Sequence, residues 1–180
     1  MPHSLELDGL HFPAFADLPP HGDAPLRGWV LLGVVFQDTS LLSRSVYWCR
    51  DREGKQFTVA LYFDNGVPKP KIAVGNTLCL ENATTHYFLD GQVGVRVEEP
   101  ESIKVLKTSL HALTTLNKEM RVPSPEMKCS KCGKADSKNR CAKCQTLYCS
   151  KECQSADWTA GHKRRCLLAG QLVEWNKKYE

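Results

Sequence analysis

The apolar residues between positions 26 and 97 occur in short runs, each long enough for one β-strand and separated by turn residues. In the last run, Val93, Val95 and Val97 alternate with polar or glycine positions, as on a strand with one buried face. The first run is long enough to bend across a barrel, with Gly33 as the expected kink or bulge. The pattern predicts five or six strands, in runs at 29–36, 45–50, 56–63, 77–81, 84–89 and 92–97.

The turns between these runs suggest how the strands connect. A glycine-containing turn at 51–55 predicts a central hairpin, Pro68 and Pro70 break the next crossing, and Asp90-Gly91 predicts a last hairpin. A long first strand followed by this order resembles the OB-fold barrel, over residues 26–106. No diagnostic motif accompanies the resemblance, so a different small β-barrel or a sandwich is the alternative.

Three other segments frame this mainly β unit. Residues 1–25 form an irregular, proline-rich leader, which is either a flexible tail or draped on the barrel through Leu10, Phe12, Phe15 and Leu18. Residues 109–120 predict a helix capped by Ser109, expected to pack on the barrel of domain 26–120, with self-association as the alternative. Residues 121–128 contain two X-Pro pairs and predict a linker.

The composition indicates the cellular compartment and shows that the two halves of the chain differ in net charge. The chain has no apolar run long enough for a membrane span, and its first residues carry acids where a signal peptide needs bases. We therefore expect a reducing location, nuclear or cytoplasmic, with Cys49 and Cys79 as buried small hydrophobes. Residues 1–100 hold eight basic and twelve acidic side chains, whereas residues 101–180 hold sixteen and eight. Zinc-bound thiolates would offset much of that basic charge, so charge alone does not indicate nucleic acid.

The C-terminal part of the chain contains a dense set of metal-ligand residues. Two pairs are spaced as C-x-x-C, which lets a tight turn aim both sulfurs at one ion, and two pairs lie four residues apart, on one face of a helix. Eight ligands in four pairs predict two four-coordinate zinc ions, held by Cys129, Cys132, Cys141, Cys144, Cys149, Cys153, His162 and Cys166. Zinc binding is expected to supply the folding free energy of so short a segment.

These ligands, with Gln154 and Asp157-Trp158 between them, closely resemble the MYND-type zinc finger over residues 129–166. The resemblance implies interleaved sites, with Cys129, Cys132, Cys149 and Cys153 on the first zinc and Cys141, Cys144, His162 and Cys166 on the second. Sequential pairing is the alternative that the sequence leaves open.

The resemblance also implies a protein-interaction role, because such fingers typically take proline-containing peptides of the Pro-x-Leu-x-Pro type by strand addition. Carried over by position, the strand edge would be Gln145, Thr146, Leu147 and Tyr148, and the pocket would use Gln154 and Trp158. Ala142 stands where some members have a serine, and Trp158 could instead belong to the small core between the zincs. The apolar stripe after the last ligand predicts a C-terminal helix over 167–180.

We therefore expect a zinc-binding adaptor, with a role in transcriptional or regulatory complexes. The alternative is a single-stranded nucleic-acid binder whose barrel stacks bases on Tyr47, Trp48, Tyr62 or Phe63. We expect no enzymatic activity, because four protein ligands per zinc leave no open coordination position and no nucleophile with a base stands out.

Overall fold

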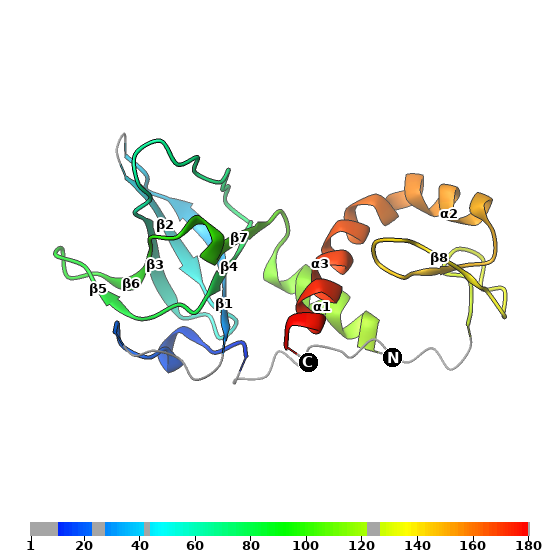
Figure 1. Cartoon of the computed structure of the whole chain (residues 1–180), viewed down its shortest axis with the longest axis horizontal. Coiled ribbons are helices and arrows are strands. Elements are labelled where there is room, and N and C mark those ends of the chain that lie inside the picture. Colours follow the sequence, from blue (N-terminus) through cyan, green and yellow to red (C-terminus); the bar gives the residue numbers. More distant parts are fainter. Residues whose placement is uncertain (1–10, 23–27, 42–43, 122–126, 180) are drawn as a thin grey trace. The chain divides into compact units, whose positions relative to one another are not determined.

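The structure is a computed structural model that describes residues 11–22, 28–41, 44–121 and 127–179 (Figure 1). The chain divides into two compact units, Leu7–Ala112 and Leu113–Glu180. Each is described by itself below. No helix in the described residues is long and apolar enough to cross a membrane.

The first unit is one curled β-sheet. Its seven strands are β1 (Val30–Asp38), β2 (Ser45–Arg50), β3 (Gln56–Leu61), β4 (Thr77–Glu81), β5 (His86–Tyr87), β6 (Val93–Val97) and β7 (Ile103–Leu106). Their order is β5-β6-β3-β2-β1-β4-β7, and every pair is antiparallel except β3 with β6. Only four residues separate β4 from β5, so the sheet must curl to bring its two ends together. A β1-β2-β3 meander closed through a parallel β3–β6 pair is the OB-like topology, which confirms the predicted fold class.

The bend in β1 has a different origin from the one expected. Gly33 stays in regular pairing with Leu78, and the register shift lies between Val35 and Gln37. A Cβ on Gly33 would lie 2.7 Å from the Phe57 ring, so glycine is required there for core packing. The prediction of a bulge at Gly33 is therefore wrong, because an aromatic side chain from β3 occupies the space above it.

The segment before β1 packs on the barrel core. Phe12, Phe15 and Leu18 are buried around a short 3₁₀ turn, η1 (Phe15–Asp17), while Leu10 lies outside the described residues. The Phe15 ring stacks on Phe57 with centroids 4.6 Å apart. The buried Asp51 carboxylate accepts a hydrogen bond from the Phe15 backbone N–H at 2.8 Å. Described residues of the proline-rich leader therefore contribute to the barrel core.

The end of this unit holds two elements that the pattern did not indicate. The 3₁₀ turn η2 (Pro100–Ser102) leads into β7, which pairs with β4. The helix α1 (Leu110–Arg121) follows, with Ser109 Oγ accepting from the Ala112 N–H at 3.3 Å, as the capping prediction requires. The division between the units falls inside α1, at Leu113, whereas the sequence placed the whole helix with the barrel. Residues 122–126 of the predicted linker lie outside the described residues.

The second unit contains little sheet and much helix. Its elements are the hairpin β8 (Asn139–Arg140) and β9 (Leu147–Tyr148), then α2 (Lys151–Asp157), the π-helical turn η3 (Trp158–His162) and α3 (Lys163–Tyr179). The three helical segments follow one another around the hairpin (Figure 1). Helix α3 begins four residues before the predicted 167, so it carries the last ligand as well as the apolar stripe. Its Ala169, together with Leu116 of α1, packs against the cysteine core.

Candidate metal centres and groove

Two clusters of soft ligands form the core of the second unit. In each cluster the four ligand atoms lie within 4.8 Å of one another. One cluster is Cys129, Cys132, Cys149 and Cys153, and the other is Cys141, Cys144, His162 and Cys166. This is the interleaved arrangement that the resemblance implied, and it differs from sequential pairing.

The distances between ligand atoms fit tetrahedral coordination. Cys132 and Cys149 Sγ are 3.6 Å apart, and Cys149 and Cys153 Sγ are 3.5 Å apart. In the other cluster, Cys141 and Cys166 Sγ are 3.5 Å apart. Sulfurs about 2.3 Å from a tetrahedral zinc would be separated by about 3.8 Å, which is close to these values. The two clusters are therefore compatible with two zinc ions.

Backbone turns aim the C-x-x-C pairs at these centres. The Gly133 N–H donates to the Cys129 carbonyl at 2.8 Å, and the Gln145 N–H donates to the Cys141 carbonyl at 2.9 Å. Gly133 has φ +75° and Gln145 has φ +60°, so both pairs end in the same left-handed turn. Glycine adopts this conformation readily in the first turn, and Gln145 has the equivalent position in the second.

Thiolate crowding explains why each cluster needs a cation. Burial opposes ionisation of Cys129, but amide hydrogen bonds outweigh it and lower the pKa of the thiol to about 6. The neighbouring Cys153 and Cys132 thiols then raise the pKa of Cys149 to about 12. Four such groups cannot all ionise without positive charge among them, and Zn²⁺ supplies that charge.

A buried carboxylate lies behind the histidine ligand. His162 Nε2 lies 3.4 Å from Cys144 Sγ inside the cluster, and its Nδ1 lies 3.7 Å from Asp157 Oδ2. The Tyr148 hydroxyl donates to the same oxygen at 2.7 Å. Burial, followed by the Asp157 carboxylate, raises the pKa of Tyr148. Asp157 thus lies behind the ring at a distance longer than a hydrogen bond, where a carboxylate is placed to support a metal-bound imidazole, a role that the sequence analysis did not assign to it.

The strand expected to pair with a peptide is already bonded within the unit. The Cys141 N–H donates to the Thr146 carbonyl and the Ser130 N–H donates to the Leu147 carbonyl, both at 2.9 Å. The Tyr148 side chain is fully buried against Asp157 and cannot reach a ligand. The first cysteine turn and the hairpin therefore use several main-chain groups of Gln145–Tyr148, and peptide pairing along this edge stays a prediction.

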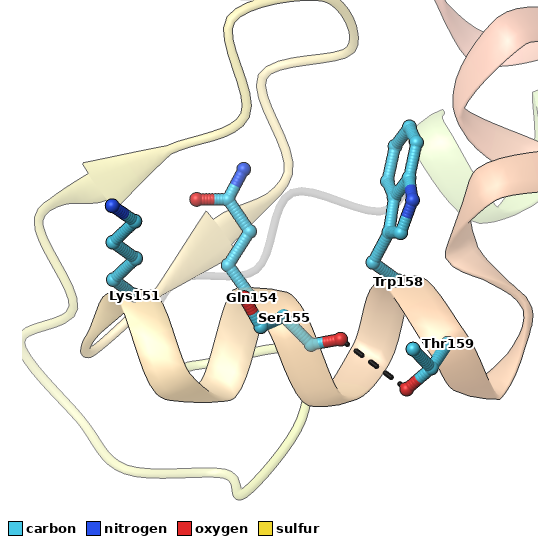
Figure 2. A pocket seen from close by; sticks show the side chains of 5 residues that line it. All are labelled: Lys151, Gln154, Ser155, Trp158 and Thr159. Atoms are coloured by element: carbon cyan, nitrogen blue, oxygen red, sulfur yellow. Dashed lines mark hydrogen bonds between the residues drawn. The ribbon is translucent and has the colours of Figure 1, made fainter.

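An open groove lies instead on the helical side of the unit. It has a volume of about 360 Å³ and is lined by Lys151, Gln154, Ser155, Trp158 and Thr159. Figure 2 shows Lys151, Gln154 and Trp158 extending to the same side of the helix. Trp158 is 39% exposed, so its ring is not buried in the core between the clusters. The structure thus brings together the two predicted pocket residues, Gln154 and Trp158, and adds three others.

The barrel aromatics named by the sequence divide into two groups. Tyr47 is buried and Phe63 packs against the core. Trp48 and Tyr62 are half-buried; the Trp48 ring packs beside Phe36, and Tyr62 contacts an arginine. The Arg50 guanidinium lies 4.5 Å from the centroid of Phe36, a neighbour of Trp48, and that of Arg96 lies 4.4 Å from the centroid of Tyr62.

Comparison with known proteins supports the assignment of the second unit. A family model described as MYND finger matches residues 129–166. A 44-residue stretch is 48% identical to part of ubiquitin carboxyl-terminal hydrolase 19 of Arabidopsis thaliana, and covers 24% of this chain but only 6% of that enzyme. The chain therefore matches a small part of the curated relative's length.

Solved structures similar to this chain include three bound to DNA. Schizosaccharomyces pombe Pot1pC bound to single-stranded DNA has a TM-score of 0.41 and 11% identity, covering 61% of this chain and 97% of that one. A murine DNA-binding protein bound to double-stranded DNA has a TM-score of 0.37 and 20% identity, covering 54% and 49%. A replication protein A heterotrimer bound to single-stranded DNA has a TM-score of 0.35 and 13% identity, covering 56% and 79%.

The TM-scores of these solved structures are too low to support the fold assignment. The OB-like assignment is therefore based on the strand connectivity alone. Residues 129–166 are a MYND finger with two interleaved clusters compatible with two zinc ions, and in this chain the finger accompanies an N-terminal β-unit of OB-like topology.

Proposed function

We propose that this protein is an adaptor whose MYND finger binds proline-containing segments, of the Pro-x-Leu-x-Pro kind, in the groove formed by Lys151, Gln154, Ser155, Trp158 and Thr159. The observation that carries the proposal is the exposed indole of Trp158 beside the Gln154 side chain. A proline ring packs well on an aromatic face, and a side-chain amide can bond the backbone beside it. Because several main-chain groups of Gln145–Tyr148 are already bonded, the proposal assigns most of the binding to the groove side chains.

The proposed role is non-catalytic, in the nucleus or cytosol. Each cluster provides four protein ligands, so a tetrahedral zinc ion keeps no position for water or substrate. The ions shape the finger and hold α2 in place through Cys149 and Cys153. The activity of the plant hydrolase is a property of that enzyme and is not part of this proposal.

The proposal is tested by isothermal titration of a Pro-x-Leu-x-Pro peptide into the full chain loaded with two zinc equivalents. We expect Trp158→Ala to weaken binding by at least about tenfold with unchanged zinc content, since central aromatic contacts dominate small interfaces. Leu167→Ala is the matched control, because Leu167 is a 62% exposed apolar residue that does not line the groove. Equal binding by wild type and Trp158→Ala, or none by either, would contradict the proposal.

A second candidate function is single-stranded nucleic-acid binding by the β-unit. The observation that favours it is the pair of aromatic–arginine contacts at Phe36 with Arg50 and at Tyr62 with Arg96. Half-buried rings beside cations are the elements on which single-stranded bases stack. Against this stands Glu98, which pairs with Arg96 and reduces the local positive charge.

This candidate predicts salt-sensitive binding of a fluorescent single-stranded oligonucleotide. Affinity should fall steeply between about 50 and 200 mM salt, and Trp48→Ala should weaken it severalfold. Tyr87→Ala, an exposed aromatic outside these contacts, is the control. An absence of binding at the lower salt concentration would exclude the candidate.

A further inference from the structure

The groove on the finger contains a cation and no anion. Lys151 lines it together with two hydroxyl side chains, an amide and an indole. Lys151 is exposed, and it forms none of the ion pairs within 4.0 Å in the described part of the chain. The nearest carboxylate in sequence is Glu152, which bonds to Ser150 and also interacts electrostatically with Lys151. Glu152 does not line the groove, so Lys151 is the charged side chain that a bound segment meets there.

The separation of Lys151 and Trp158 along the helix determines how many residues of a bound peptide fit between them. The two residues are seven positions apart in a helical stretch, which corresponds to about 10 Å along the axis. Gln154 lies between them, and all three side chains extend to the same side (Figure 2). An extended peptide advances about 3.3 Å per residue, so three of its residues cover this distance.

We propose that the segment bound by the finger carries an acidic side chain three residues from the proline that packs on Trp158, and that Lys151 selects it. The inference rests on the proposed function and adds the charge and position of one partner residue. Residues 128–166 contain ten basic and three acidic side chains, and Asp157 among the acids is buried. Zinc-bound thiolates would offset part of this excess, so the argument depends on the position of Lys151 in the groove. An exposed ion pair contributes at most about 1 kcal/mol, so the expected selectivity is severalfold.

The experiment measures dissociation constants for three peptides on the zinc-loaded full chain. One peptide is a neutral Pro-x-Leu-x-Pro host, and the others carry Asp three residues before or three residues after the proline. We expect one aspartate peptide to bind about three- to fivefold more tightly than the neutral host at low salt. Lys151→Gln should bring the dissociation constants of the aspartate and neutral peptides within about twofold of each other, whatever its effect on the neutral peptide itself. Lys151→Glu should reverse the preference.

The matched control is Lys134→Gln, which removes the same charge from the finger outside the residues that line the groove. If Lys134→Gln removes the gain as effectively as Lys151→Gln, the preference comes from the overall field and the assignment to Lys151 is overturned. If the neutral peptide binds but neither aspartate position improves it, the inference fails and the proposed function stands. If no peptide binds, the proposed function fails and the inference with it.

Discussion

At the residue scale, two buried carboxylates organise the two units in similar ways. Asp157 lies behind the histidine ligand and accepts from the Tyr148 hydroxyl. Asp51 accepts through one oxygen from the Phe15 N–H, and through the other from the N–H groups of Glu53 and Lys55 at 2.9 and 2.8 Å. Each carboxylate fixes a group from another part of the chain, so its removal leaves that group without a partner.

Asp157→Asn should weaken zinc binding at the cluster that contains His162 by about 10- to 100-fold, because it removes the negative charge that lies 3.7 Å from the His162 ring nitrogen. The measurement is competition with a chelator of known affinity, with total zinc counted by mass spectrometry. Tyr148→Phe is the control, since it removes only the hydroxyl bond to Asp157 and keeps the carboxylate. Wild-type zinc affinity in Asp157→Asn would show that packing alone orients the ring.

Asp51→Ala should lower the free energy of unfolding of the β-unit by about 3 kcal/mol, because a buried N–H loses its acceptor at Phe15. Chemical denaturation followed by intrinsic fluorescence measures this change. Asp38→Ala is the control, because Asp38 accepts a comparable bond from the Ser40 N–H at an exposed position. Equal destabilisation by both variants would mean that Asp51 acts only within its turn.

At the scale of elements, the two zinc clusters differ in exposure. Cys132 is exposed and Cys149 and Cys153 are half-buried, whereas all four ligands of the other cluster are buried. Both ligands on the α2 side belong to the first cluster, since Cys153 lies in α2 and Cys149 just precedes it. The exposed cluster therefore fixes the start of α2, whereas His162 of the buried cluster lies in η3, which carries Trp158 and Thr159 of the groove.

Because the two clusters differ in exposure, zinc should pass to a chelating indicator dye in two phases, each releasing one zinc ion per chain. The exposed cluster should release its ion first. Cys132→Ala should remove the fast phase and leave one bound equivalent, because the buried cluster keeps all its ligands. Lys131→Ala, a neighbouring surface change without a ligand, should behave as wild type. Release of both ions in one phase would contradict independent clusters.

At the scale of the whole molecule, only one unit depends on metal. The β-unit has its own apolar core, which includes Leu31, Phe57 and Leu78, whereas the core of the finger consists largely of its ligands. Cys49 and Cys79 are buried in the first unit, as the sequence predicted. Burial raises the pKa of the Cys49 thiol to about 12, and it also raises the pKa of Cys79.

Removing zinc should therefore unfold the finger and leave the β-unit folded. Alkylation with iodoacetamide at about pH 8, read by mass spectrometry, should modify the seven finger cysteines after chelation and spare Cys49 and Cys79, whose thiols stay protonated and buried. Denaturant should expose all nine cysteines and serves as the control. Modification of Cys49 upon chelation alone would show that the two units unfold together.

The sequence by itself determined the features that depend on local pattern. The strands at 45–50 and 77–81 have their predicted bounds, because alternation and flanking turn residues specify a strand within a few positions. The eight ligands and the Ser109 cap follow from spacing within short segments.

Tertiary structure alone decided the features that depend on residues distant in the chain. β7 is too short to stand out as a run and exists because β4 offers it a partner. Gly94 shows no local signal, yet a Cβ there would lie 2.0 Å from the Thr58 carbonyl oxygen across the parallel pair. The interleaving of the clusters, the bond from Phe15 to Asp51 and the occupied Leu147 edge likewise join separate segments. Periodicity and spacing describe what one segment prefers, and these contacts arise only when a second segment is placed beside it.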